Sequence, residues 1–150
     1  MTSRFQLVPA AYVFLQRGAQ VLLQLRADTG YMDGYWAAAA AGHVEADESV
    51  YDAAAREAHE ELGVRIEKSD LVPLCGMHRT ADDHQWVDER VDFFFACRRW
   101  YGEPTLLEAK ATDLQWFALD RLPDPVVPHE RAVLDGIRAG RLSPIVTFGF

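Results

Sequence analysis

The sequence predicts a mixed α/β fold in which helices cover both faces of a β-sheet. Short β-rich segments recur along the chain, among them residues 8–16 and 20–26. Residues 91–98 carry apolar side chains on both faces, which is typical of a strand that is covered on both sides. Helical spacing over 48–62 and 129–139 supplies the two covering layers.

The first half of the chain contains three expected strands. Residues 8–16 are apolar, and a turn at Gly18 leads into 20–26, where apolar and polar residues alternate. Asp33-Gly34 then marks a loop. Residues 35–41 include five alanines, but the run is short and bracketed by glycines. We therefore expect one central strand there, packed beneath a helix where only small side chains fit.

The second half of the chain adds further strands and a terminal helix. Strands are expected at residues 64–66, 71–78, 91–98 and 113–118. The polar segment 80–90 is long enough to border a pocket. Three prolines then form an extended crossing, and the helix at 129–139 is expected to end at Gly140.

The helix at 48–62 carries an acidic cluster. Glu57, Glu60 and Glu61 are neighbours at i, i+3 and i+4, and their like charges repel each other unless a cation neutralises them. Carboxylate oxygens suit Mg²⁺, or Mn²⁺ in its place. The alternative is the solvated acidic face of an ordinary amphipathic helix.

The ends and the buried side of this helix can also be predicted. Asp47 is expected to cap its N-terminus, and Gly63 is expected to end it in a left-handed conformation. A stripe at helical spacing is expected to face the sheet: Tyr51, Ala55, Ala58 and Leu62.

Residues 42–64 read GHVEADESVYDAAAREAHEELGV and match G-x5-E-x7-R-E-U-x-E-E-x-G-U at every fixed position, with Ala58 as a small member of the aliphatic class U. The segment therefore resembles the Nudix box, and the surrounding pattern is similar to a Nudix domain over nearly the whole chain. The resemblance implies one α/β/α sandwich over residues 1–150 that hydrolyses nucleoside diphosphate derivatives with divalent metal. Ala40 and Ala41 stand where the commonest family pattern has Pro-Gly.

The resemblance also assigns roles within the box. The metal-binding positions are matched by the carbonyl of Gly42 and by Glu57, Glu60 and Glu61. Arg56 matches the box arginine, which either orients a box glutamate through an ion pair or takes part directly. Glu48 is expected to have the same structural role.

Outside the box, the resemblance points to one further carboxylate and one arginine. Glu108 is preferred over Glu103 as base or extra metal ligand, because LLEAK resembles the family's Glu-x-Lys element before the strand that holds Trp116-Phe117. A solvent-facing carboxylate is the alternative. Arg26 ends a strand where the family places a phosphate-contacting arginine, and a surface charge is its alternative. Several aromatic residues stack on a base or simply pack: Tyr31, Tyr35, Trp36 and Trp86.

The composition fits one ordinary domain of 150 residues, with 49% apolar and 25% charged residues. A net charge of −8 argues against a broad nucleic-acid surface and favours a free nucleotide substrate over a polymer. Cys75 and Cys97 lie in no metal-ligand pattern and are expected to be core thiols. Because the N-terminus lacks a long apolar run and no stretch has the length of a membrane span, we expect a cytoplasmic protein.

Three functions compete on these observations. The leading hypothesis is a Mg²⁺-dependent pyrophosphohydrolase acting on a (deoxy)nucleoside triphosphate or another nucleoside diphosphate derivative. The oligomeric state is left open, with a homodimer as one alternative. A nucleotide-sensing domain that does not cleave its ligand is the second, although such relatives usually lose box carboxylates. The third is an allylic diphosphate isomerase, which needs Cys75 or Cys97 in the pocket. Release of phosphate or pyrophosphate separates the hydrolase from the other two.

Overall fold

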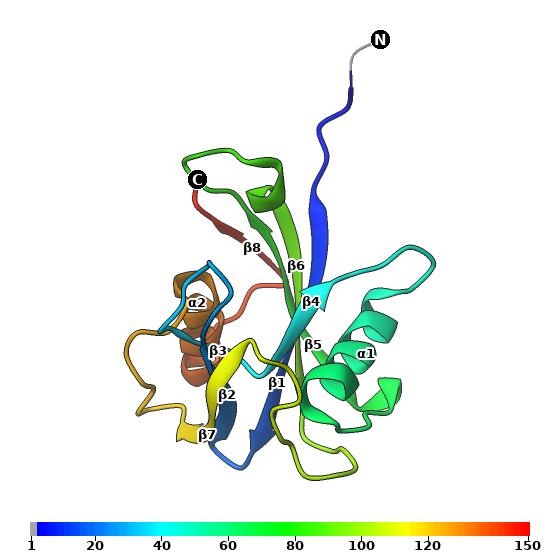
Figure 1. Ribbon diagram of the computed structural model, residues 1–150. Helices are drawn as coiled ribbons and strands as arrows, with labels where there is room; N and C mark the ends of the chain where they lie inside the picture. Colours follow the sequence, from blue (N-terminus) through cyan, green and yellow to red (C-terminus); the bar gives the residue numbers. More distant parts are fainter. Residues whose placement is uncertain (1–2) are drawn as a thin grey trace.

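The computed structural model describes residues 3–150, which form a mixed eight-stranded sheet with α-helices on both faces (Figure 1). The strands are β1 (Val8–Arg17), β2 (Gln20–Arg26), β3 (Trp36–Ala38), β4 (Ala40–His43), β5 (Leu71–Arg79), β6 (Arg90–Cys97), β7 (Ala111–Ala118) and β8 (Ile145–Phe148). The helices are α1 (Val50–Leu62) and α2 (Pro128–Ala139), with short 3₁₀ helices at η1 (Lys68–Asp70) and η2 (Trp86–Asp88). The predicted fold class is confirmed. Between residues 3 and 150, no helix is long and apolar enough to cross a membrane.

Strand β1 lies at the centre of the sheet and is buried on both faces. The main strand order is β3-β2-β1-β6-β5-β8, with β4 paired to β1 and β7 paired to β2. β1 runs parallel to β6, and β5 runs parallel to β8, whereas the other pairs are antiparallel. One face of β1 packs with α1 through Ala11, Val13 and Leu15. The other face packs with α2 through Ala10, Tyr12 and Phe14.

The alanine-rich segment forms two strands and not the single one that was expected. β1 and β2 pair only beside their turn, at Gln16 with Val21 and Arg17 with Gln20. The segment therefore fills the space between the two diverging strands, pairing first with β2 as β3 and then with β1 as β4. All its alanines from 37 to 40 are buried, as the close-packing argument requires.

The remaining expectations mostly agree with the structure. The strand at 20–26 and the left-handed helix end at Gly140 are confirmed. The strand expected at 64–66 is wrong, because only Arg65 makes a single bridge, to Tyr101. Strand β8 was not expected from the sequence, because its four residues are half exposed at an edge of the sheet and carry a weak periodic signal.

Candidate active site

Helix α1 begins at a different cap from the one predicted. Asp47 sits in a left-handed turn with φ 66°, two residues before Ser49, which is the N-cap. Ser49 is extended, with φ −80° and ψ 168°, and its hydroxyl accepts a hydrogen bond from Asp52 N at 3.1 Å. Asp52 accepts one from Ser49 N in return at 3.0 Å, which completes a capping box. At the other end, Gly63 adopts the predicted left-handed conformation, with φ 72°.

The buried side of α1 is rotated relative to the predicted stripe. Ala58 and Leu62 are buried as expected, but Tyr51 is 37% exposed. The full buried set is Ala53, Ala54, Glu57, Ala58, Glu61 and Leu62. The small side chains of Ala53 and Ala54 let this side of the helix lie close to the sheet, which buries two box glutamates with it.

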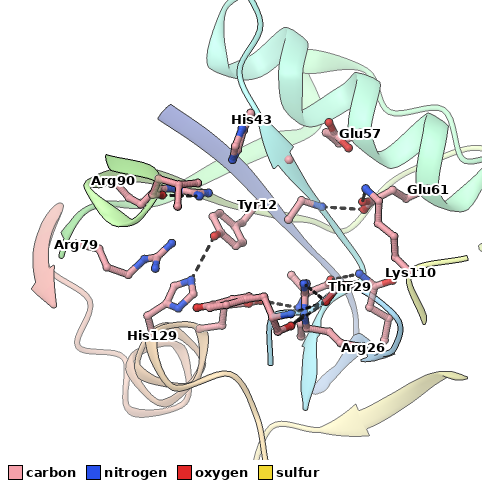
Figure 2. Close-up of a pocket in the computed structure, with 18 of the residues that line it drawn as sticks. Tyr12, Arg26, Thr29, His43, Glu57, Glu61, Arg79, Arg90, Lys110 and His129 are labelled. Atoms are coloured by element: carbon pink, nitrogen blue, oxygen red, sulfur yellow. Dashed lines mark hydrogen bonds and ion pairs between the residues drawn. The ribbon is translucent and has the colours of Figure 1, made fainter. Parts of the chain in front are cut away.

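These two glutamates line a cavity of about 730 Å³. Strands β1 to β6 and both helices contribute to its wall, together with η2, the loop after β2 and Lys110 before β7. Figure 2 shows Glu57, Glu61 and Lys110 toward one side of the cavity, and Arg79 and Arg90 toward the other.

Glu61 is held by two groups from outside its helix. Its Oε2 accepts a hydrogen bond from Ala41 N at 2.9 Å, and its Oε1 lies 3.4 Å from Lys110 Nζ. Burial raises the pKa of Glu61 to about 7, and the Ala41 N–H and Lys110 oppose that rise. The backbone of β4 therefore fixes this carboxylate at the cavity wall.

Glu57 lies directly against the backbone of Gly42. A Cβ added at Gly42 would collide with the Glu57 carboxylate, so the first box glycine makes room for this side chain. Arg56 Nη1 donates to Glu57 Oε1 at 2.8 Å. Burial raises the pKa of Glu57, while the Arg56 hydrogen bond and charge lower it.

Arg56 connects the carboxylates of the box and does not line the cavity. Arg56 Nε and Nη2 donate hydrogen bonds to the two carboxylate oxygens of Glu48, at 3.0 and 2.7 Å. This two-point pairing lowers the pKa of the Glu48 carboxyl. The same guanidinium donates to Glu57, to Glu60 at 3.2 Å and to the carbonyl of His43 at 3.0 Å. This geometry matches an arginine that orients glutamates.

Two other predicted residues lie outside the cavity lining. The side chain of Glu60 is 48% exposed and pairs with Arg56. Glu108 pairs with Lys110 Nζ at 2.9 Å, and Lys110 also reaches Glu61, so it joins the two carboxylates. Glu103 is exposed.

Arg26 ends β2 and lines the cavity. Its Nε donates to the carbonyl of Tyr31 at 2.9 Å, and its Nη2 donates to Thr29 Oγ1 at 3.1 Å. Its guanidinium also lies 5.4 Å from the centre of the Tyr31 ring. Among the four aromatic candidates, Tyr31 lines the cavity, whereas Trp36 packs edge-on against Phe117.

The cavity wall contains two carboxylates that could hold a divalent metal ion together with a ligand. Within residues 3–150, no three His, Cys, Asp or Glu side chains are grouped around a common metal position. The cavity instead offers Glu57, Glu61 and the backbone at Gly42. Mg²⁺ typically takes one or two carboxylates and completes its shell with water and substrate phosphates.

Sequence reasoning missed the wall opposite the box. Asp92 is fully buried and binds Arg79 Nε at 2.7 Å. Glu130, at the start of α2, accepts a hydrogen bond from Ala38 N at 2.7 Å, and burial raises its pKa to about 7. His129 shares a hydrogen bond with the hydroxyl of Tyr12 at 3.2 Å. The available signal was Asp92, an acidic residue between the apolar Val91 and Phe93 in an expected strand.

Comparisons with known proteins agree with this arrangement. A family model described as NUDIX domain matches residues 6–136. The NAD-capped RNA hydrolase NudC of Pseudomonas aeruginosa is 30% identical over 128 residues, which cover 85% of this chain and 41% of that protein. The chain thus spans about two fifths of the length of the curated relatives it matches.

Solved structures share the same arrangement of elements. The crystal structure of a MutT NUDIX hydrolase from Burkholderia pseudomallei superimposes with a TM-score of 0.77 at 29% identity, covering 87% of this chain and 97% of that one. A MutT protein from Bacillus halodurans has a TM-score of 0.74 at 21% identity, covering 96% and 90% of the two chains, and shows the likeness of fold alone.

Proposed function

Because the chain belongs to the Nudix family of pyrophosphohydrolases, we propose that it uses Mg²⁺ to hydrolyse a diphosphate bond in a (deoxy)nucleoside triphosphate or another nucleoside diphosphate derivative. The observation that carries this proposal is the pair of buried carboxylates, Glu57 and Glu61, on the cavity wall beside Gly42. A cation that neutralises them would offset the cost of burying two like charges one helical turn apart.

The metal would be held by Glu57, Glu61 and the carbonyl of Gly42. Glu60 is the weaker candidate of the three box glutamates, because its carboxylate pairs with Arg56 outside the cavity. A bound divalent ion would neutralise phosphate charge and lower the pKa of a coordinated water. Mn²⁺ is expected to substitute for Mg²⁺.

Chain residues would supply the rest of the chemistry. Arg26 and Lys110 line the cavity and can donate to phosphate oxygens. Glu108 remains our candidate base, acting beside Lys110, which joins it to Glu61. Arg56 is proposed to position Glu57, since it contacts this carboxylate but does not line the cavity. With a net charge of −8, the partner is proposed to be a small nucleotide and not a polymer.

The isomerase alternative has little support in the geometry. Cys75 and Cys97 are both buried, and neither is among the cavity-lining residues of the described chain. Burial also raises the pKa of Cys75 to about 11, which disfavours the reactive thiolate.

The experiment is a substrate screen with Mg²⁺ that measures released phosphate, pyrophosphate and nucleoside monophosphate. Nucleoside triphosphates, nucleotide sugars and dinucleotides belong in it, as does NAD-capped RNA, because one relative carries that activity in its name. Glu61→Gln is the inactive comparison, and the exposed Glu103→Gln is the matched control. Binding without any product in the wild type would favour the nucleotide sensor and overturn the hydrolase proposal.

A further inference from the structure

The cavity wall opposite the box carries two adjacent arginines. Arg79 ends β5 and Arg90 begins β6, and the antiparallel register places them opposite each other. Both line the cavity, and Figure 2 shows them on the side away from Glu61 and Lys110. The proposed hydrolysis gives neither arginine a role.

These two guanidinium groups share one buried carboxylate. Asp92 Oδ2 accepts a hydrogen bond from Arg79 Nε at 2.7 Å, whereas its Oδ1 lies 3.5 Å from Arg90 Nε and has no hydrogen-bond partner in the described chain. His129 adds no negative charge. Two positive groups therefore face one negative group.

Two further acids lie near this wall. Asp88 and Glu130 line the cavity, but neither forms an ion pair with Arg79 or Arg90. Burial raises the pKa of Glu130 to about 7, so this group is partly neutral near physiological pH. Within residues 3–150, Arg79 and Arg90 therefore have Asp92 as their only ion-pair partner.

Several donors on these arginines are also unused. Arg79 is only 7% exposed, yet within residues 3–150 its two terminal nitrogens donate to no protein acceptor. Arg90 Nε is buried and, within the described residues, makes no hydrogen bond, although it lies 3.5 Å from Asp92 Oδ1, and Arg90 Nη1 donates to the carbonyl of Val87 at 3.3 Å. Arg79 and Arg90 line the cavity, and the planar fork of arginine fits the oxygens of a phosphate that binds there.

We propose that Arg79 and Arg90 form a subsite for a phosphate monoester that the substrate carries at a distance from the scissile diphosphate. The orientation of the substrate rests on the proposed function, which places the diphosphate at Glu57 and Glu61. The preferred substrates are then nucleoside diphosphate derivatives with an additional phosphate on the ribose or on the linked moiety. Arg79 and Arg90 discriminate between substrates and leave the reacting bond to the box.

The test compares substrates that differ only in that phosphate: NADPH with NADH, and coenzyme A with its 3′-dephospho form. The wild type should show a higher kcat/KM for the phosphorylated member of at least one pair, by about 10- to 100-fold, the range of a charge-assisted contact. Arg79→Lys and Arg90→Gln should lose most of this preference, while kcat/KM for the unphosphorylated member changes by less than about threefold. The exposed Arg138→Gln is the control and should keep it.

Folding and turnover are monitored separately. Arg79→Lys keeps a cation beside Asp92, and its Tm checks that the buried pair still folds. Calorimetric binding of the same compounds in the Glu61→Gln background reports the subsite without hydrolysis. A phosphate preference in binding, with no wild-type turnover of these compounds or of any other in the substrate screen, would leave the subsite standing and overturn the hydrolase proposal.

Turnover without a phosphate preference, in either pair and in binding, would overturn the subsite alone. Equal losses for both members of a pair in the arginine variants would also overturn it.

Discussion

Adding one methyl group at Gly42 separates the geometry of the site from the stability of the fold. The backbone of Gly42 lies outside the left-handed region, so alanine fits the local conformation. Its Cβ, however, would occupy the place of the Glu57 carboxylate. Because that carboxylate is the far end of a flexible side chain, we expect it to move while the strand stays in place.

The two consequences differ in size. Replacing glycine with alanine in a compatible backbone stabilises a protein by about 0.4–1 kcal/mol, and losing the charged Arg56–Glu57 hydrogen bond costs about 1.5–3 kcal/mol before solvent compensation. The net loss of about 0.5–2.6 kcal/mol should lower Tm by about 1–10 °C in a chain of this size. Displacing a proposed metal ligand by about 1 Å should lower kcat/KM by about 10²-fold.

The assay is kcat/KM with saturating Mg²⁺, paired with thermal unfolding of the same preparation. Gly76→Ala is the matched control, because it is also a strand glycine outside the left-handed region and no atom lies within 4 Å of its added Cβ. We expect Gly76→Ala to behave as the wild type. Wild-type kcat/KM in Gly42→Ala would refute the role of Gly42 as the space for Glu57, and so would an activity loss explained entirely by unfolding.

Three further predictions follow from the same geometry. Glu61→Gln should reduce kcat by at least about 10²-fold and Glu60→Gln by clearly less, measured at equal Tm, and the reverse order would contradict the assignment of the cavity wall. Glu108→Gln should lower kcat by about 10²–10⁴-fold if Glu108 activates water, whereas the exposed Glu103→Gln should leave kcat nearly unchanged. A loss of kcat in Glu103→Gln alone would make Glu103 the base in place of Glu108. Burial raises the pKa of Glu130 to about 7 from 4.5, so the folded state binds the additional proton in that window and wild-type stability falls as pH rises through it. Glu130→Gln should therefore equal the wild type near pH 4 and exceed it by about 3 kcal/mol near pH 8 in chemical denaturation, and a parallel pH dependence of both proteins would contradict this.

The box and the layers of the fold could be predicted because both depend on local spacing. Helical periodicity placed Glu57 and Glu61 on one helix, and the glycine after Leu62 fixed its end. The direction in which Glu60 points could not be predicted, because it depends on how α1 is rotated about its axis. That rotation is set by the close contact of small residues such as Ala53 with the sheet.

The opposite wall could not be predicted for a different reason. The pairing of Arg79 with Asp92 joins two neighbouring strands, and the contact of Glu130 with Ala38 spans 92 positions in sequence. Local periodicity indicates which side of a strand is buried, but not which distant residue meets it. The break of the alanine segment into β3 and β4 has the same origin, since it follows from the divergence of β1 and β2.

The most direct test of the central claim measures metal binding and hydrolysis on the same protein. Mn²⁺ binding, followed by electron paramagnetic resonance, should be clear in the wild type with a nucleotide present and strongly weakened in Glu61→Gln. Hydrolysis should stop in EDTA and return when Mg²⁺ or Mn²⁺ is added in excess. Undiminished turnover in the chelator, or wild-type Mn²⁺ affinity in Glu61→Gln, would contradict the assignment of Glu57 and Glu61 as the metal-binding pair.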